Sequence, residues 1–225
     1  FIAAGEARRR GLSDEELVNA ALLIMAAGLI AARLIYVWAN WEYFAEDASE
    51  IWHLASGGLS FHGGLLGGLA AALIFARLRG WSFPDLADCA ALGLSLGYAL
   101  ARVGCHVPGR PTAMPWGVAV NGMKVHPQGV YAVMASYAIF VFLWKLRLQT
   151  KFWGQLFVVW SLAYGVSRFF IEYFRYGRLW GPFTLTQWGS LAMIAIGAYL
   201  CRRWEGEPPP YPRPRSVSFT RQEAL

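Results

Sequence analysis

Six long apolar segments constrain this sequence more than any other feature. A transmembrane helix needs about 20 consecutive apolar residues, and six segments approach or exceed that length, the last being the shortest: 17–39, 54–76, 84–104, 127–145, 153–173 and 186–201. The chain is 56% hydrophobic and 15% charged, whereas soluble domains average about 45–50% and about 25%. We therefore predict an all-α polytopic transmembrane helical bundle with six full spans.

The amino terminus predicts one more helix. The chain starts at Phe1, and "FIAAGEARRRG" lacks the basic region ahead of an apolar run that marks a signal peptide. We interpret this stretch as the end of a helix that begins before Phe1, which would give seven helices in all. The sequence "SDEE" from Ser13 predicts a capping box at the start of the first full span. Residues 1–203 are expected to form one transmembrane domain.

Basic residues gather in alternate loops. They precede the first full span, follow the second, join the fourth to the fifth and follow the last: Arg8, Arg9, Arg10, Arg77, Arg79, Lys145, Arg147, Lys151, Arg202 and Arg203. The positive-inside rule makes these ends cytoplasmic, the carboxyl end included. The Pro-rich stretch 204–225 predicts a disordered cytoplasmic tail. Because this distribution accounts for the net charge of +6, we expect no nucleic-acid partner.

The cysteines favour neither a disulfide framework nor a metal site. Cys89, Cys105 and Cys201 share no CxxC spacing, and no HExxH motif occurs. Two of the three fall on the predicted cytoplasmic side, where disulfides rarely persist. We predict no metal and no cofactor. Asp88, near the cytoplasmic start of its helix, is interpreted mainly as structural.

Polar residues in and beside the apolar segments fall into one layer toward the outer side: Arg33, His62, Arg102, His106, Arg110, His126, Tyr164, Arg168, Glu172 and Arg175. The last four are spaced by 4, 4 and 3 residues, so they share one helix face. Several arginines in one apolar cavity repel one another unless an anion neutralises them, and the planar guanidinium suits a phosphate. The pattern predicts an outward-facing, partly lipid-embedded pocket for a phosphate-bearing ligand.

The same residues also have structural interpretations. Arg33 can extend to the outer headgroups without contacting a ligand. Glu172 can form an ion pair with a neighbouring arginine that serves only the fold. His62 can be a core histidine with satisfied hydrogen bonds.

The stretch "FHGGLLGG", from Phe61 to Gly68, combines a histidine with four glycines inside an apolar segment. Glycine weakens a helix by about 1 kcal/mol relative to alanine, and a histidine is costly in hydrocarbon. Overlapping small-xxx-small spacings are typical of close helix packing. We predict that the glycines pack against a neighbouring helix and thereby turn His62 into the polar pocket.

Five stretches in this order resemble the motifs of the bacterial prolipoprotein diacylglyceryl transferase family: "SFHGGLLGG", "ARVGCHVPGRPTAMPWGV", "HPQGVY", "YGVSRFFIEYFR" and "GPFTLTQWGS". The resemblance implies a seven-helix enzyme of the bacterial inner membrane. It would transfer the diacylglyceryl group of phosphatidylglycerol to the lipobox cysteine thiol of a preprolipoprotein and release glycerol phosphate. Its site would face the outer side. We expect a membrane-embedded monomer with these two substrates as its partners.

The resemblance also assigns roles to individual residues. The catalytic groups would be His62, Arg102, Tyr164 and Arg168, and the phosphatidylglycerol head group would contact Arg102, Arg168, Glu172, Arg175, Arg33 and His126. Arg102 and Arg168 are the candidates for fixed cations that stabilise the charge developing on the departing phosphate. How the thiol loses its proton stays open. His62 or His126 could accept the proton, or the arginines could lower the pKa of the thiol.

Three departures from the family pattern touch the predicted site. An expected Asn is Cys105, the segment 106–110 is shortened, and the Glu that ends the family's HPxxLYE motif is replaced by Ala132. They motivate an alternative function, that of a catalytically degenerate paralogue that binds phospholipid. An anion transporter fits less well, because the polar layer lies toward the outer side rather than at the midplane, and we find no inverted repeat.

Overall fold

The computed structural model describes residues 2–53, 57–104 and 109–206 of the 225-residue chain. The protein is mostly helical (73%), with eight α-helices in these ranges. It divides into two compact units, Phe1–Cys89 and Ala90–Leu225, and the division falls inside one helix. His106 and the tail 207–225 lie outside the described residues, so the predictions made for them are not examined by the structure.

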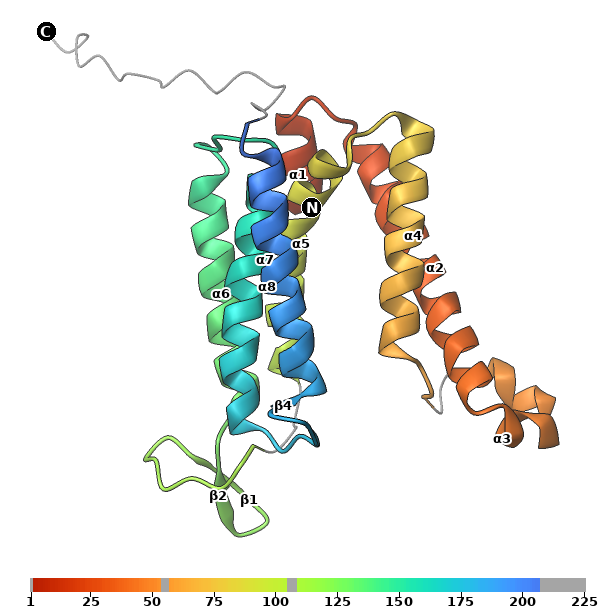
Figure 1. Ribbon diagram of the computed structural model, residues 1–225, viewed down its shortest axis with the longest axis vertical. Helices are drawn as coiled ribbons and strands as arrows, with labels where there is room; N and C mark the ends of the chain where they lie inside the picture. Colours follow the sequence, from red (N-terminus) through yellow and green to blue (C-terminus); the bar gives the residue numbers. More distant parts are fainter. Residues whose placement is uncertain (1, 54–56, 105–108, 207–225) are drawn as a thin grey trace, which may run out of the picture. The chain divides into compact units, whose positions relative to one another are not determined.

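The first unit is built on two long helices that lie side by side (Figure 1). Its elements in chain order are α1 (Ile2–Arg9), α2 (Asp14–Ala39), α3 (Trp41–Glu46), a 3-10 turn (Ala48–Trp52), α4 (Phe61–Arg79) and the start of α5 (Phe83–Val103). A buried cluster at one end joins α1, α2, α4 and α5 through residues such as Ala7, Leu17, Phe75 and Leu86.

The second unit is a bundle of helices with two small hairpins. After the remainder of α5 come β1 (Val118–Val120), β2 (Met123–Val125), α6 (Gln128–Leu146), α7 (Gln155–Ile171), a 3-10 turn (Glu172–Phe174), β3 (Leu179–Trp180), β4 (Phe183–Thr184) and α8 (Leu185–Trp204). Both hairpins are antiparallel, with Val118 opposite Val125 and Leu179 opposite Thr184. The helix α7 packs against both α6 and α8 (Figure 1). The buried Ser136 hydroxyl donates to the Ser95 carbonyl at 3.1 Å and ties α6 to α5.

Each of the six predicted spans contains a helix, and three of these helices, α2, α5 and α6, are long and apolar enough by themselves to cross a membrane. The helix α7 has 17 residues, about 25 Å at 1.5 Å per residue, against a hydrocarbon thickness of about 30 Å. The prediction that the second span begins near residue 54 is wrong, since α4 begins at Phe61. The cause is local. Gly57 and Gly58 have φ of 86° and 77°, which are not helical values, so the helix begins only after the Ser60 cap.

Helix caps explain where several elements begin. The Ser13 hydroxyl accepts from the Glu16 amide at 3.2 Å and caps α2, but the reciprocal half of the predicted capping box does not form. The Glu16 carboxylate instead accepts from the Trp81 indole at 3.1 Å. The complete capping box lies at α8, where the Thr184 hydroxyl and the Gln187 amide satisfy each other's backbone N–H groups.

Glycines bring α2 and α4 into backbone contact, as the sequence predicted. A Cβ at Gly63 would lie 2.5 Å from the Ala31 carbonyl oxygen, and one at Gly67 would overlap the Ala31 side chain. At Gly64 and Gly68, in contrast, a Cβ would meet only ordinary contacts, the nearest at 3.6 Å. Two of the four glycines are therefore required for close approach, and two tolerate a methyl group.

We expect Gly67→Ala to lower the free energy of unfolding by about 1–3 kcal/mol, because the added methyl group overpacks the α2–α4 contact. The neighbouring Gly68→Ala is the control, and it should be neutral or stabilise the helix by up to about 1 kcal/mol. Thermal unfolding in detergent measures both. Equal stabilities for the two variants would contradict the packing described here.

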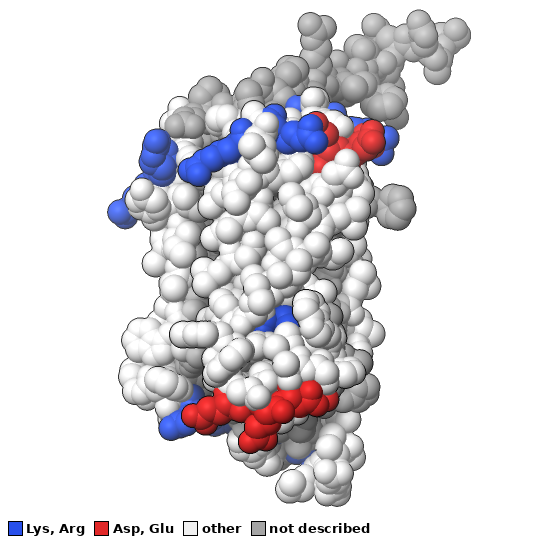
Figure 2. Space-filling model, turned by 90° about the vertical axis from the view of Figure 1, so that its right-hand side faces the viewer, with Lys and Arg blue, Asp and Glu red and all other residues white. Residues whose placement is uncertain are grey.

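Charges on the first unit separate along its helices. The last turn of α4 carries Arg77 and Arg79, whereas the connection after α2 carries the acidic residues Glu42, Glu46, Asp47 and Glu50. Figure 2 shows a largely uncharged surface over α2 and α4, interrupted by one basic patch, with basic residues beside a few acidic ones at one end and mainly acidic residues at the other. The positive-inside rule uses such a difference between the two ends of a helix to predict which end is cytoplasmic.

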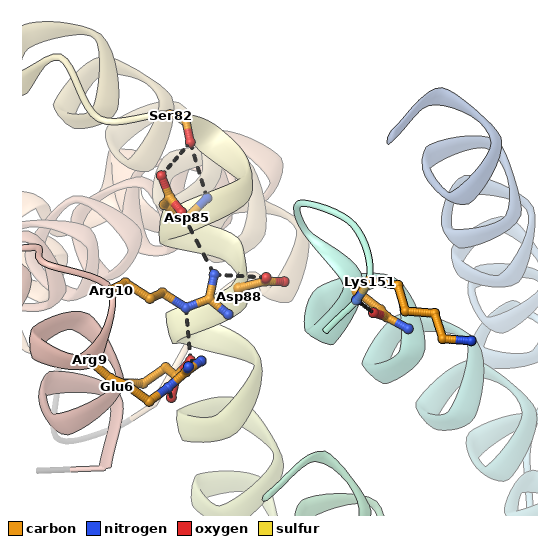
Figure 3. Close-up of polar contacts among 8 residues, drawn as sticks. Glu6, Arg9, Arg10, Ser82, Asp85, Asp88 and Lys151 are labelled. Atoms are coloured by element: carbon orange, nitrogen blue, oxygen red, sulfur yellow. Dashed lines mark hydrogen bonds and ion pairs between the residues drawn. The ribbon is translucent and has the colours of Figure 1, made fainter. Parts of the chain in front are cut away.

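A buried ionic network joins α1 to the start of α5 (Figure 3). The Arg10 guanidinium lies 2.8 Å from the Glu6 carboxylate and 2.9 Å from Asp88, while its distance to Asp85 is 3.7 Å. Arg9 adds a second pair with Glu6 at 2.5 Å. The side chains of Arg10, Glu6 and Asp88 are fully buried. Asp88 thus lies in a structural ion pair, in agreement with its interpretation from the sequence.

Candidate active site

Two arginines share one buried carboxylate at the end of α7. The Glu172 side chain is 3% exposed, and its Oε2 lies 3.0 Å from the Arg168 guanidinium and 4.0 Å from that of Arg175. The Thr184 hydroxyl donates to Oε1 at 3.3 Å and fixes the carboxylate against the start of α8. Because one carboxylate neutralises only one of two guanidinium groups, this cluster keeps a net positive charge in a largely apolar unit.

The four residues predicted to share one helix face do not all lie on the helix, because α7 ends before Arg175. Arg168 is in α7, Glu172 is the helix C-cap, and Arg175 has extended backbone with φ −116° and ψ 152°. Arg175 reaches Glu172 from beyond the helix and not along the same helix face. Its backbone pairs with Gly109 of the loop between α5 and β1 in an antiparallel bridge.

Tyr164 and Arg102 meet at an aromatic cluster one turn before Arg168. The Tyr164 ring stacks on Trp160 with centroids 5.4 Å apart and meets the Tyr98 ring edge-to-face at 5.2 Å. The Arg102 guanidinium lies 5.0 Å from the centre of the Tyr98 ring. Tyr164 is within electrostatic range of both Arg168 and Arg102. The structure thus gathers three of the four predicted catalytic residues around one aromatic group.

A small cavity lies among these side chains. Its volume is about 10 Å³, and it is lined by Tyr98, Ala132, Ser136, Tyr164, Ser167, Arg168 and Ile171. A space of this size holds about one water-sized group. The cavity offers several hydroxyl groups and one guanidinium to whatever oxygen occupies it.

His126 is held in place just before α6. Its Nδ1 lies 3.1 Å from the Tyr131 hydroxyl, which also accepts a hydrogen bond from the Trp116 indole at 2.8 Å. Because the indole N–H can only donate, the Tyr131 hydrogen stays free to point toward the histidine. The His126 ring also packs on Phe174 at 4.8 Å. This arrangement orients His126 close to the segment that carries Arg175.

Arg33 is 7% exposed and serves as an anchor for the loop after α2. Its guanidinium donates to the carbonyl oxygens of Glu50, Ile51, His53, Gly57 and Gly58 at 2.5–3.4 Å. It also lies 5.2 Å from the centre of the Phe44 ring. These contacts favour a structural role over both extension to the headgroups and direct binding of a phosphate.

We expect Arg33→Gln to lower the free energy of unfolding by about 2 kcal/mol, because a hydrogen bond from a charged group contributes about 1.5–3 kcal/mol and the loop loses several of them from Arg33. Thermal unfolding in detergent and proteolysis next to Glu50 would measure this change. If the variant keeps normal stability but loses all affinity for phosphatidylglycerol, Arg33 belongs to the ligand site.

The remaining predicted residues have other surroundings. His62 is exposed in the first turn of α4 and belongs to the first unit, as does Arg33. Arg110 is exposed and its Nε donates to the Arg175 carbonyl oxygen at 3.0 Å, so it ties the loop between α5 and β1 to the segment after α7. Among the described residues there is no group of three or more His, Cys, Asp or Glu side chains that could hold a metal ion. Cys89 and Cys201 are free thiols.

Comparisons with known proteins identify the family of this chain. The model of the prolipoprotein diacylglyceryl transferase family matches residues 1–203. The chain belongs to this family. A phosphatidylglycerol–prolipoprotein diacylglyceryl transferase of Clostridioides difficile is 38% identical over 202 residues, covering 88% of this chain and 82% of the relative. An enzyme of the same name from Thermosynechococcus vestitus is 31% identical, covering 91% of this chain and 83% of the relative. One from Bacillus cereus is also 31% identical, covering 87% of this chain and 79% of the relative.

One departure from the transferase family's pattern falls directly at the site. Ala132, which stands where the family motif has Glu, is 4% exposed and lines the small cavity beside Arg168. A carboxylate is thus absent at this position, and the surroundings of Arg168 are more positive than a Glu would make them. The departure at Cys105 lies outside the described residues. Gly109, which belongs to the shortened segment 106–110, leaves no room for a Cβ, because one would overlap the carbonyl oxygens of His126 and Phe174.

Three residues of this candidate site were missed by sequence reasoning: Tyr98, Tyr131 and Thr184. Tyr98 precedes Arg102 by four residues, as Tyr164 precedes Arg168, so the helical i, i+4 spacing could have identified it. Tyr131 follows His126 in the recognised "HPQGVY" stretch. The contact of Thr184 with Glu172 spans 12 residues across a hairpin, and no local pattern indicates it.

Proposed function

We propose that this chain transfers the diacylglyceryl group of phosphatidylglycerol to the lipobox cysteine thiol of a preprolipoprotein. Relatives at up to 38% identity are named for this activity. The structural observation that carries the proposal is the pair of arginines, Arg168 and Arg175, that share the buried Glu172. The excess positive charge suits the phosphate of the lipid head group.

The reaction explains why cations are needed there. The cysteine thiolate attacks the glyceryl carbon that bears the phosphate ester, a C–S bond forms, and the C–O bond breaks. The phosphate leaves as glycerol phosphate, so its charge changes from that of a diester to that of a monoester dianion. Fixed positive groups therefore stabilise the transition state more than the bound lipid, which is the condition for catalysis. Arg168 and Arg102 take this role, and Glu172 positions Arg168.

The thiol must lose its proton before it attacks, since the thiolate is the nucleophile. His62 and His126 are both candidates for the base. We expect replacement of the base by Gln to reduce kcat/KM about 100-fold at neutral pH, in line with typical general-base effects. Parallel measurements of kcat/KM for His62→Gln and His126→Gln test this. Native-like values in both variants would instead support an arginine field that lowers the pKa of the substrate thiol.

The proposed arrangement in the membrane has six spans, with residues 1–203 as one domain. The site faces the outer side of a bacterial inner membrane, and the carboxyl terminus is cytoplasmic. Support comes from the three apolar helices of sufficient length and from the separation of charge on the first unit (Figure 2). We propose that the enzyme works as a monomer without a cofactor.

Complementation tests the proposed activity in cells. A strain depleted of its own transferase should regain growth and lipid-modified lipoproteins when it expresses this protein, and a variant with Arg168→Gln should not restore them. The position of Ala132 in the cavity favours one competing function, that of a lipid-binding protein without turnover. Phosphatidylglycerol binding by a protein that never restores growth would support that competitor.

A further inference from the structure

One buried tyrosine hydroxyl of the second unit makes no hydrogen bond within the described part of the chain. It belongs to Tyr98 of α5, which lines the small cavity together with Arg168. The Tyr98 side chain interacts with that of Tyr164, and the two rings are 5.2 Å apart and nearly perpendicular, but the Tyr98 hydroxyl does not reach hydrogen-bond geometry. A buried hydroxyl without a partner costs about 1–3 kcal/mol. A ligand oxygen that accepts from Tyr98 removes this cost.

The other groups around the cavity do not use this donor. The Ser136 and Ser167 hydroxyls already donate to backbone carbonyl oxygens, at 3.1 and 3.0 Å. Each hydroxyl has a single hydrogen, so neither serine can donate to a ligand at the same time. Ala132 adds only a methyl group, and the residues that line the cavity include no carboxylate that could accept from Tyr98.

The two tyrosines lie about one helical turn from Arg168. Tyr164 precedes Arg168 by four residues, which is about 6 Å along α7 at 1.5 Å per residue, and Tyr98 meets the ring of Tyr164. In the proposed orientation this direction leads from the outer surface toward the hydrocarbon. Phosphatidylglycerol carries its two acyl esters on the hydrocarbon side of its phosphate. A lipid whose phosphate contacts Arg168 therefore brings its ester groups to the depth of the tyrosines.

The size of the cavity fits one ester carbonyl oxygen. A volume of about 10 Å³ holds one water-sized group, which is too little for a phosphate or for the glycerol of the head group. A carbonyl oxygen accepts hydrogen bonds and has no hydrogen to donate, so it complements the Tyr98 hydroxyl and brings no unpaired donor into the apolar interior.

We propose that Tyr98 is a specificity-determining residue whose hydroxyl donates a hydrogen bond to an ester carbonyl oxygen of the diacylglyceryl group. The site then prefers ester-linked lipids over ether-linked lipids, which lack the carbonyl. The proposal rests on the proposed function, because it takes phosphatidylglycerol as the lipid and Arg168 as a contact of its phosphate. The bonds that change during transfer do not involve Tyr98.

Competition binding to the purified protein in dodecyl maltoside micelles tests the proposal. The competitors of labelled phosphatidylglycerol are diacyl phosphatidylglycerol and its dialkyl ether analogue of equal chain length. The native protein should bind the diester about tenfold more tightly than the diether, the effect of one hydrogen bond. Tyr98→Phe should reduce this preference to within about twofold by weakening the diester alone. Tyr199→Phe is the matched control and should keep the preference, because Tyr199 is 66% exposed on α8.

The stability of Tyr98→Phe without lipid gives a second readout. The variant keeps the ring and loses a buried hydroxyl that has no partner, so its melting temperature in detergent should equal or exceed that of the native protein. A clearly lower melting temperature would show that the hydroxyl serves the fold, and it would overturn the proposal.

Three binding results would also overturn it: equal affinities of the native protein for diester and diether, a full ester preference in Tyr98→Phe, or an equal loss of affinity for both lipids in that variant. The last result would assign the hydroxyl to the phosphate or the head group. Transfer and binding separate the two proposals. Transfer without an ester preference would refute the role of Tyr98 alone, whereas an ester preference that depends on Tyr98 in a protein that transfers nothing would refute only the proposed function.

Discussion

Arg168→Gln is expected to reduce kcat/KM for diacylglyceryl transfer by about 100- to 1,000-fold, the usual effect of removing one group that stabilises a developing negative charge. Gln keeps the polarity of the side chain but has no charge to offer the departing phosphate. The side chain is 11% exposed beside the cavity and held by Glu172 at 3.0 Å, so neighbouring water cannot easily replace it. Transfer of labelled lipid to a lipobox peptide measures the loss.

The control must separate lost chemistry from lost stability, because Arg168→Gln also leaves Glu172 with Arg175 as its remaining cation in the cluster. A double variant, Arg168→Gln with Glu172→Gln, removes that imbalance, and we expect it to recover stability but not transfer. Arg202→Gln, at the exposed end of α8, should match the native protein in both respects. Recovery of transfer in the double variant would show that Arg168 serves only to neutralise Glu172.

Arg10→Gln is expected to lower the free energy of unfolding by about 3–5 kcal/mol, because breaking a buried ion pair leaves an uncompensated charge in the interior. Arg10 holds Glu6 and Asp88 together at 2.8 and 2.9 Å, and all three side chains are fully buried (Figure 3). Without the guanidinium, the carboxylates face one another across the contact between α1 and α5. Thermal unfolding in detergent and the yield of folded protein would report the change.

Arg8 provides a matched control two residues away. It pairs with Asp14 at 3.1 Å, but the side chains are 67% and 44% exposed, and such pairs contribute about 0–1 kcal/mol. Arg8→Gln should therefore have a small effect. Similar melting temperatures for Arg8→Gln and Arg10→Gln would mean that the buried network does not stabilise the first unit.

Hydropathy predicted the positions of the helices well, because apolar length is a property of each segment alone. Helix ends were less predictable, since they depend on the backbone conformation of individual residues. The helix α4 begins seven residues later than expected because Gly57 and Gly58 adopt positive φ. The hairpin β1–β2 was missed, although Asn121 and Gly122, with φ of 48° and 80°, form the Asn-Gly turn that favours such hairpins.

Site residues that interact along one helix were predictable from spacing, and those that interact across the chain were not. The Arg168–Glu172 pair follows from the i, i+4 rule. The role of Arg33 could not be predicted, because the carbonyl groups that it binds come from a loop 17 to 25 residues further along the chain. Similarly, a run of glycines indicates close packing, but only the positions of Ala27 and Ala31 on α2 show that Gly63 and Gly67 are the tight ones.

The most direct test of the account is a transfer assay with the purified protein, phosphatidylglycerol labelled in its acyl chains, and a synthetic lipobox peptide. We predict that the label becomes attached to the peptide cysteine through a thioether and that one glycerol phosphate is released for each modified peptide. A peptide with Ser in place of Cys should remain unlabelled. Tight binding of phosphatidylglycerol with no labelled peptide and no glycerol phosphate would contradict the account.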